Sequence, residues 1–212
     1  MEKNIIILTK SVKHSGYCIA GIDYETGDWI RLVSSNINTE GAVPEEQLIL
    51  NNGKYLDVYD IIRVDIIKSV ATLVQPENCL YNEQKEWVYN GESNLHEVID
   101  KHGYDNPDFV FINSDRRVEA DTVFDGSPSL LLLNIQVGEI FIKTFESQKI
   151  QINFWYNGIK YQYIKVTQTD LKDFFRGKND GSYPLCSHSI VFSLTDKYVD
   201  NRYYKVVAQF LE

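Results

Sequence analysis

Apolar and polar residues alternate along most of the chain with a period of two, which is the pattern of β-strands that bury one face. In the first hundred residues this pattern predicts strands at 3–9, 17–24, 29–34 and 56–69. Glu25-Thr26-Gly27-Asp28, between the second and third of these strands, favours a turn that joins paired strands. The pattern therefore indicates a mostly β protein.

The clearest local signal is a hairpin in the second half of the chain. Residues 149–156 and 159–166 alternate, and Asn157-Gly158 between them suits a type I′ turn, which needs two positive φ values. A two-residue loop puts one set of side chains toward the core: Ile150, Ile152, Phe154, Tyr156, Ile159, Tyr161 and Tyr163. The opposite face then carries Gln151, Asn153, Trp155, Lys160 and Gln162. Further strands are predicted at 109–112, 130–135, 139–144, 188–194 and 203–211.

Short helical segments interrupt the strands. Residues 44–48 favour a helical turn, residues 94–102 a helix capped by Asn94, and residues 169–175 a helix capped by Thr169 or Asp170. The polar stretch 113–126 has no clear period, so we place a domain boundary there and expect units at 1–120 and 121–212. Each unit has about five strands and a short helix, which predicts two small OB-like β-barrel units, although SH3-like or PUA-like barrels use similar parts.

Composition excludes several classes of protein. The chain has 212 residues, 43% of them hydrophobic and 24% charged, which is typical of a globular protein. No apolar run reaches the roughly 18 to 20 residues of a membrane span, and the start lacks the apolar core of a signal peptide. We therefore expect a cytoplasmic protein with no membrane partner.

The sequence offers little for metal or covalent chemistry. The three cysteines are widely separated, so we interpret them as reduced thiols. Cys186 and His188 share a strand face, but a structural zinc site needs four ligands and the chain has no CxxC motif. Nucleophile-elbow, Walker and dinucleotide motifs are also missing. We expect no metal and no cofactor, and catalysis is unsupported without being excluded.

The net charge of −9 disfavours unspecific binding to polyanions, but the charge is unevenly distributed. Residues 1–105 carry 9 basic and 17 acidic side chains, whereas residues 106–212 carry 12 and 13. Residues 149–178 carry six basic and two acidic side chains, net +4. The second half therefore contains one locally basic segment.

Several short motifs resemble the prokaryotic dual OB-containing domain family. They begin with Ile7-Leu8-Thr9-Lys10-Ser11-Val12-Lys13-His14, Tyr17-Cys18-Ile19-Ala20-Gly21-Ile22-Asp23 and Gly27-Asp28-Trp29-Ile30-Arg31-Leu32-Val33. The likeness continues through 56–58, 75–78 and 166–170 to Tyr203-Tyr204-Lys205-Val206-Val207-Ala208, nearly the whole chain. The resemblance implies two OB-like units and nucleic-acid binding, with no established catalytic set.

Two groups in the first unit are candidates for ligand contact. Alternation puts Trp29 and Arg31 together outside the core, next to Gly21, where a base could stack and a phosphate could bind. Alternatively, Trp29 packs on a neighbouring domain and Arg31 pairs with Asp23 or Asp28. Lys10, Lys13 and His14 are expected in a loop at the ligand groove, or else they form an ordinary solvated loop.

In the second unit Trp155 and Lys160 are expected to be exposed together, and Lys172 and Arg176 add basic charge nearby. An exposed tryptophan is costly without a purpose. We therefore predict a protein that binds single-stranded or unpaired nucleic acid by stacking and basic contacts. The alternative is a protein-interaction or regulatory module in which the same aromatic side chains meet a protein partner.

Overall fold

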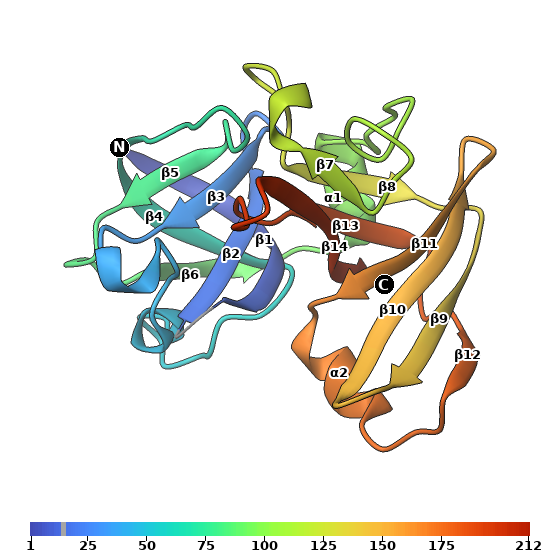
Figure 1. Ribbon diagram of the computed structural model, residues 1–212. Coiled ribbons are helices and arrows are strands. Elements are labelled where there is room, and N and C mark those ends of the chain that lie inside the picture. The colour runs from blue at the N-terminus through green and yellow to red at the C-terminus, as the bar shows by residue number, and fades with distance from the viewer. Residues whose placement is uncertain (14–15) are drawn as a thin grey trace. The chain divides into compact units, whose positions relative to one another are not determined.

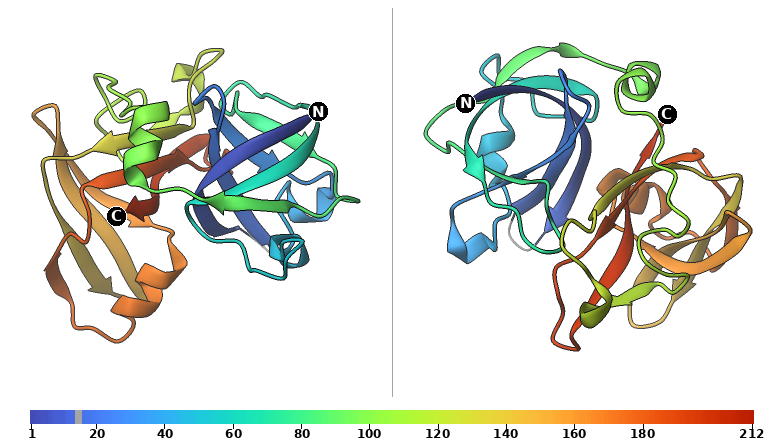
Figure 2. Two further views of the ribbon diagram at one scale, coloured as in Figure 1. Left: turned by 180° about the vertical axis from the view of Figure 1, so that it is seen from behind. Right: turned by 90° about the horizontal axis from the view of Figure 1, so that it is seen from above.

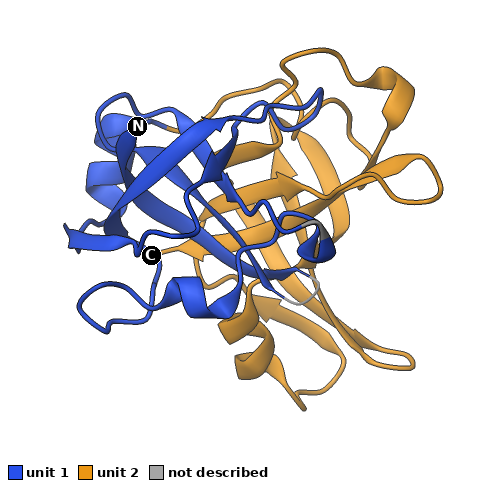
Figure 3. Ribbon diagram, turned by 90° about the vertical axis from the view of Figure 1, so that its left-hand side faces the viewer, with its two compact units in different colours: residues 1–103 blue, residues 104–212 orange. Residues whose placement is uncertain are grey.

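The computed structural model describes residues 1–13 and 16–212, and β-strands dominate it (Figure 1). The chain divides into two compact units, Met1–Gly103 and Tyr104–Glu212 (Figure 3). Strand content far exceeds helix content in both, which confirms the predicted mostly β class. No helix among the described residues is long and apolar enough to cross a membrane.

Unit 1 is a closed barrel. Its strands are β1 (Glu2–Lys13), β2 (Gly16–Asp23), β3 (Trp29–Val33), β4 (Asp60–Ser69) and β5 (Asn78–Tyr81), with β6 (Val88–Glu92) added beside β4. They pair in the order β1-β2-β3-β5-β4, and β4 pairs back with β1 (Figures 1 and 2). The β3–β5 pair is parallel and the other pairs are antiparallel.

Local signals in unit 1 act as the sequence predicts. A 3-10 turn covers Glu45–Leu48, where residues 44–48 favour a helical turn, and another covers Ile37–Thr39. Helix α1 (Leu95–Lys101) is capped by Asn94, whose side chain accepts a hydrogen bond from the backbone N–H of Glu97 at 3.1 Å. The predicted long strand 56–69 is shorter in the structure, because β4 begins at Asp60.

Strand pairing in unit 1 shows which side chains of β2 and β3 lie on the same face. Ile19 lies opposite Leu32, and both belong to the apolar core, whereas Ala20 lies opposite Arg31 and Ile22 opposite Trp29. Gly21 serves the barrel itself, because a Cβ there would lie only 1.9 Å from the carbonyl oxygen of Ile6. The close approach that glycine permits is therefore made by strand β1.

Unit 2 repeats this strand order. Its elements are β7 (Arg117–Glu119), a 3-10 turn (Ala120–Thr122), β8 (Leu130–Asn134), β9 (Val137–Thr144), β10 (Gln148–Tyr156), β11 (Ile159–Val166), α2 (Thr169–Phe175), β12 (Gly181–Pro184), β13 (Ser189–Leu194) and β14 (Arg202–Leu211). The order is β12-β9-β10-β11-β14-β13-β8, with β11 parallel to β14. Strands β8 and β9 follow one another in the chain, so together they take the place of β1 in unit 1. Both units are OB-like, as predicted.

The division after Gly103 falls earlier than the expected boundary at 120. Several contacts hold the intervening segment to unit 2. Asp105 and Leu132 exchange hydrogen bonds, the backbone N–H of Val110 donates to the Tyr161 hydroxyl at 3.0 Å, and β7 pairs with β14. A strand predicted at 109–112 is also wrong, since only an isolated bridge joins Phe109 and Phe111 there. These contacts are long-range in sequence, and local pattern cannot predict them.

A buried lysine lies beneath the same segment. Lys205 on β14 is only 2% exposed, and its Nζ donates to the side-chain Oδ1 of Asn113 at 2.9 Å and to the Asn113 carbonyl. Its ammonium lies 5.2 Å from the centre of the Tyr161 ring. Burial lowers the pKa of Lys205 to about 7.

The predicted hairpin is confirmed, with one change of register. Asn157 and Gly158 both have positive φ, and Trp155 pairs with Lys160. Between the next pairs β10 has one residue, Asn153, whereas β11 has two, which makes a β-bulge at Tyr163 with φ 58°. The bulge reverses the alternation there. Tyr163 is therefore exposed, contrary to the prediction. Asn153 keeps the predicted face beside Trp155, opposite Glu139, but its side chain is buried there.

Candidate nucleic-acid interface

The outer side of β9, β10 and β11 is a sheet surface that combines aromatic and basic side chains; we call it the β9–β11 face. The opposite side of these strands is buried and carries Ile140, Ile142, Ile152 and Phe154. The side chains of the β9–β11 face are Val137, Glu139, Phe141, Lys143, Lys149, Gln151, Trp155, Lys160, Tyr163 and Lys165.

Trp155 and Lys160 lie opposite each other across the hairpin, as predicted. Trp155 is 45% exposed, and Lys160 is exposed and forms no ion pair among the described residues. On its other side Trp155 lies opposite Val137, which is also exposed. A flat aromatic side chain beside an ammonium suits a base stacked on the ring with its phosphate nearby.

A second aromatic group results from the bulge. Tyr163 is 43% exposed, and its ring meets the ring of Phe141 edge to face at 5.5 Å between centroids. The bulge is held by Asn153, whose Oδ1 accepts from the backbone N–H of Tyr163 at 2.8 Å. Strict alternation turns Tyr163 inward, so the sequence prediction missed both rings. Asn153 fits the alternation of its own strand, so it gave no signal of the bulge.

Two further lysines lie at the hairpin between β9 and β10. Lys143 and Lys149 are directly paired, and both ammonium groups lie within 6 Å of the centre of the exposed Phe145 ring. Lys143 also forms an ion pair with Asp180 at 3.3 Å, whereas Lys149 has none among the described residues. Lys149 belongs to the basic segment 149–178, but it is not one of the residues predicted to bind nucleic acid.

Lys165 and Lys172 add positive charge beside β11. Lys165 lies opposite Gln151 and is exposed. Burial lowers the pKa of Lys172, and the nearby charge of Lys165 lowers it further. Lys172 is thus a partly buried residue of α2, and Lys165 is the better placed of the two for a solvent-borne phosphate.

One carboxylate belongs to the β9–β11 face. Glu139 is the only acidic residue in strands β9, β10 and β11. Its Oε1 accepts a hydrogen bond from Nδ2 of Asn153 at 3.1 Å. Hydrogen bonds from Asn153 and Ser182 lower the pKa of Glu139, with a smaller contribution from the charge of Lys160, so the group is ionised at neutral pH.

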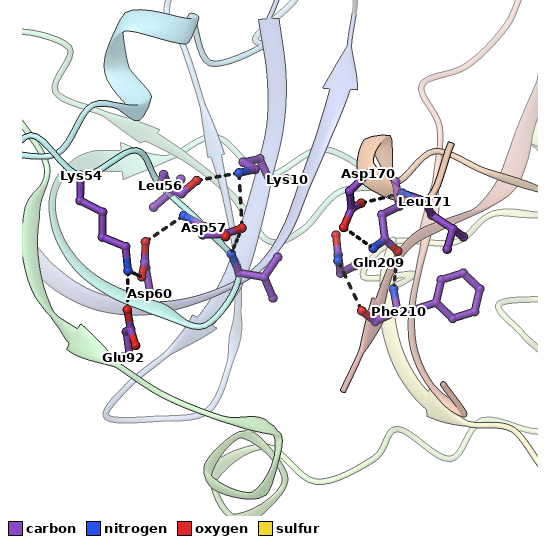
Figure 4. A network of polar contacts seen from close by, with 12 residues as sticks. Lys10, Lys54, Leu56, Asp57, Asp60, Glu92, Asp170, Leu171, Gln209 and Phe210 are labelled. Carbon is purple, nitrogen blue, oxygen red and sulfur yellow. Dashed lines mark hydrogen bonds and ion pairs between the residues drawn. The ribbon is translucent and has the colours of Figure 1, made fainter. Parts of the chain in front are cut away.

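Helix α2 is less suited to ligand contact than the sequence suggested. Arg176 forms an ion pair with Asp173 one turn earlier. Neither Thr169 nor Asp170 caps the helix, because the cap position falls on Gln168, which makes no capping bond. The side-chain Oε1 of Gln168 instead accepts a hydrogen bond from the backbone N–H of Phe210, and its Nε2 donates to Asp170. Figure 4 shows the contact between Asp170 and the backbone N–H of Leu171.

In unit 1 the prediction that Trp29 and Arg31 form a stacking and phosphate-binding surface is wrong. Arg31 is 5% exposed and pairs with Glu77 at 3.1 Å. Trp29 is partly buried, with its ring edge to face with His102 at 5.1 Å. Both side chains are on the predicted strand face, but that face is covered, so neither is available for stacking or for phosphate.

The basic group at the start of the chain also lies elsewhere. Lys10 and Lys13 belong to strand β1, which continues past the expected loop. Lys10 donates to the Leu56 carbonyl at 2.7 Å and lies 3.4 Å from Asp57 (Figure 4). Lys13 donates to the Glu40 carbonyl. His14, named with them, lies outside the described residues.

Other cations of unit 1 are engaged in the same way. Lys54 contacts the buried carboxylate of Asp60 at 2.6 Å and Glu92 at 2.5 Å (Figure 4). These two acids raise the pKa of Lys54. Lys85 pairs with Asp65 at 2.8 Å. These lysines neutralise acids of their own unit.

The fold and the face define an OB-type β-barrel protein with an aromatic and basic strand surface. A family model for the dual OB-containing domain matches residues 3–210, so the chain belongs to that family. The resemblance found in the sequence motifs is confirmed. Comparison with curated proteins and with solved structures gives no match.

Proposed function

We propose that this protein binds single-stranded or otherwise unpaired nucleic acid through the β9–β11 face of unit 2. The observation that carries the proposal is the exposed Trp155 directly opposite Lys160, on a face with further lysines and aromatic rings. Sequence-tolerant binding of single strands uses this combination, since every base can stack on an aromatic ring and every linkage carries a phosphate.

The position of the face in the barrel supports the proposal. OB-folds that bind oligonucleotides use the surface of their second and third strands together with neighbouring loops. Strands β10 and β11 take these two places in unit 2, because β8 and β9 together form the first strand. The structure therefore combines suitable side chains with the surface that this fold commonly uses.

The acidic net charge does not oppose this binding mode. Unit 2 carries 12 basic and 14 acidic residues, net −2, but exposed charges are screened over roughly 8 to 10 Å at physiological salt. A ligand on the face therefore responds mainly to Lys149, Lys160 and Lys165, none of which forms an ion pair with another described residue. Local charge, not the sum over the chain, governs the contact.

Titration of labelled oligonucleotides, followed by their anisotropy at several salt concentrations, tests the proposal. Trp155→Ala should weaken binding about tenfold or more, since stacking contributes roughly 1 to 3 kcal/mol per base. Phe124→Ala is the matched control, because Phe124 is an exposed aromatic of unit 2 outside these strands. Both variants should keep the melting temperature of the parent.

Two results would count against this function. Equal affinity of the Trp155 and Phe124 variants would place binding elsewhere on the protein. Failure of the parent to bind any oligonucleotide at low salt would favour a protein-interaction module, in which Trp155 and Val137 meet an apolar surface of a partner.

A further inference from the structure

On this basis of nucleic-acid binding, we infer that Glu139 reads the bases, and that the preferred ligand is a single strand rich in bases with an exocyclic amino group, with cytosine favoured over thymine. The inference rests on the proposed function and adds a preference to it. It starts from a contradiction, because a carboxylate on a surface built for a polyanion weakens phosphate binding.

The carboxylate is well placed for a base edge. Glu139 lies two residues from Val137 on β9, and Val137 lies directly opposite Trp155. Side chains two residues apart on a strand share a face and are separated by about 7 Å. A base stacked on Trp155, or its neighbour along the strand, therefore lies within reach of the Glu139 carboxylate.

The carboxylate is also oriented before any ligand arrives. Asn153 lies opposite Glu139, donates to its Oε1 at 3.1 Å, and accepts from the backbone of Tyr163 with its own Oδ1. The bulge thus holds the side chain of Asn153 in place, and Asn153 in turn orients the carboxylate of Glu139. A carboxylate has about four lone-pair positions, so acceptor capacity remains after the bonds from Asn153 and Ser182.

An ionised carboxylate accepts hydrogen bonds and cannot donate them. It pairs with the amino group of cytosine, which is the usual partner of a carboxylate among the base edges. Thymine presents a carbonyl oxygen where cytosine has its amino group, so it meets repulsion at the same position. Attraction for one base and repulsion of the other together give selectivity.

The test compares oligodeoxycytidylate with oligodeoxythymidylate of about twelve nucleotides, a length within the site size of OB-folds, at neutral pH. These ligands share a backbone and a ring size. The parent protein should bind the cytidylate about tenfold more tightly. In Glu139→Gln the ratio of the two affinities should fall toward one. Most of this change should come from tighter binding of the thymidylate, because the glutamine amide can donate a hydrogen bond to the thymine carbonyl.

Glu146→Gln is the matched control. Glu146 is exposed in the turn between β9 and β10, so its substitution removes the same charge at another position. This substitution should increase the affinity for both oligonucleotides by the same factor, so the ratio of the two affinities should not change. A thermal melt of Glu139→Gln shows whether the loss of a bond to Asn153 has disturbed the hairpin.

The outcomes separate this inference from the proposed function. If the parent binds both ligands and Trp155→Ala weakens both, while the two ligands bind equally or both glutamine variants give the same ratio, base reading by Glu139 is overturned and the function stands. If neither ligand binds at low salt, the function fails and the inference with it.

Discussion

In unit 1 the described lysines and arginines mostly serve the barrel, whereas on the β9–β11 face of unit 2 several point into solvent without an acid. Lys3, Arg31 and Lys54 of unit 1 are paired with Asp23, Glu77 and Asp60, three carboxylates that are almost fully buried. Lys149, Lys160 and Lys165 of unit 2 form no ion pair among the described residues. The same strand order can therefore place cations beside buried acids or leave them facing solvent, and the difference lies in which acids the neighbouring strands present.

The largest expected difference between the two units is the loss of stability when one cation is removed from each. Arg31→Ala should lower the free energy of unfolding by about 3 to 5 kcal/mol, because it removes the guanidinium that pairs with the buried Glu77 carboxylate. Lys160→Ala should change it by less than about 0.5 kcal/mol, as for most surface substitutions. Chemical denaturation measures both, and similar values for the two variants would refute the contrast.

A double variant shows whether the pair or the packing is responsible. Arg31→Met combined with Glu77→Leu removes both charges from the buried site, and such replacements are often neutral or stabilising. It should recover most of the stability that Arg31→Ala loses. If it is as unstable as the single variant, the loss reflects packing and not an unpaired charge.

The salt dependence of oligonucleotide binding compares the cations of the two units in a second way. Replacing Lys149, Lys160 and Lys165 together by glutamine should reduce the slope of log affinity against log salt by about 2, since each phosphate contact on a single strand contributes about 0.7. Replacing Arg63, Lys68 and Lys85 of unit 1 removes the same charge. That variant should leave the slope nearly unchanged, and equal slopes in the two variants would show that no particular face holds the phosphates.

Lys205 differs from the other cations of unit 2, because it is almost fully buried and forms no ion pair among the described residues. Its pKa is about 7 in the folded chain and near 10.4 in an unfolded chain, so the unfolded state binds more protons between these values. Stability should therefore rise by up to about 1.4 kcal/mol per pH unit between pH 7 and 9. Urea denaturation across this range measures the slope, and Lys205→Met should abolish it; an equal slope in that variant would assign the effect to another group.

The two helices differ on a smaller scale. Asn94→Ala should cost about 1 kcal/mol, because it removes the capping bond of α1. Thr169→Ala at the start of α2 should cost less than about 0.5 kcal/mol, since no side chain caps that helix. Thermal unfolding of the two variants distinguishes these values, and an equal loss would mean that Thr169 has a role that the structure does not reveal.

Sequence reasoning worked where a local rule decides the structure. Asn157-Gly158 requires a particular turn, and Trp155 and Lys160 follow from it by alternation. Asn94 is likewise a local cap. These features need no knowledge of distant residues.

It failed where a distant partner decides. Arg31 is on the predicted face, but Glu77, far away in sequence, makes that face a buried ion pair. The extra residue at the bulge turns Tyr163 to the opposite face, and nothing in the alternation marks the position of the bulge. The segment before residue 120 joins unit 2 through contacts with β14 and Leu132. Such effects come from pairing across the fold and not from period or turn chemistry.

The placement of the three tryptophans gives the two units separate optical signals. Trp87 is enclosed in the core of unit 1 and Trp29 is partly covered in the same unit, whereas Trp155 of unit 2 is open to solvent. Emission at long wavelength, and its quenching by iodide, therefore reports on the β9–β11 face. Emission at short wavelength reports on the barrel of unit 1, so one spectrum can follow the loss of each unit during unfolding without any attached dye.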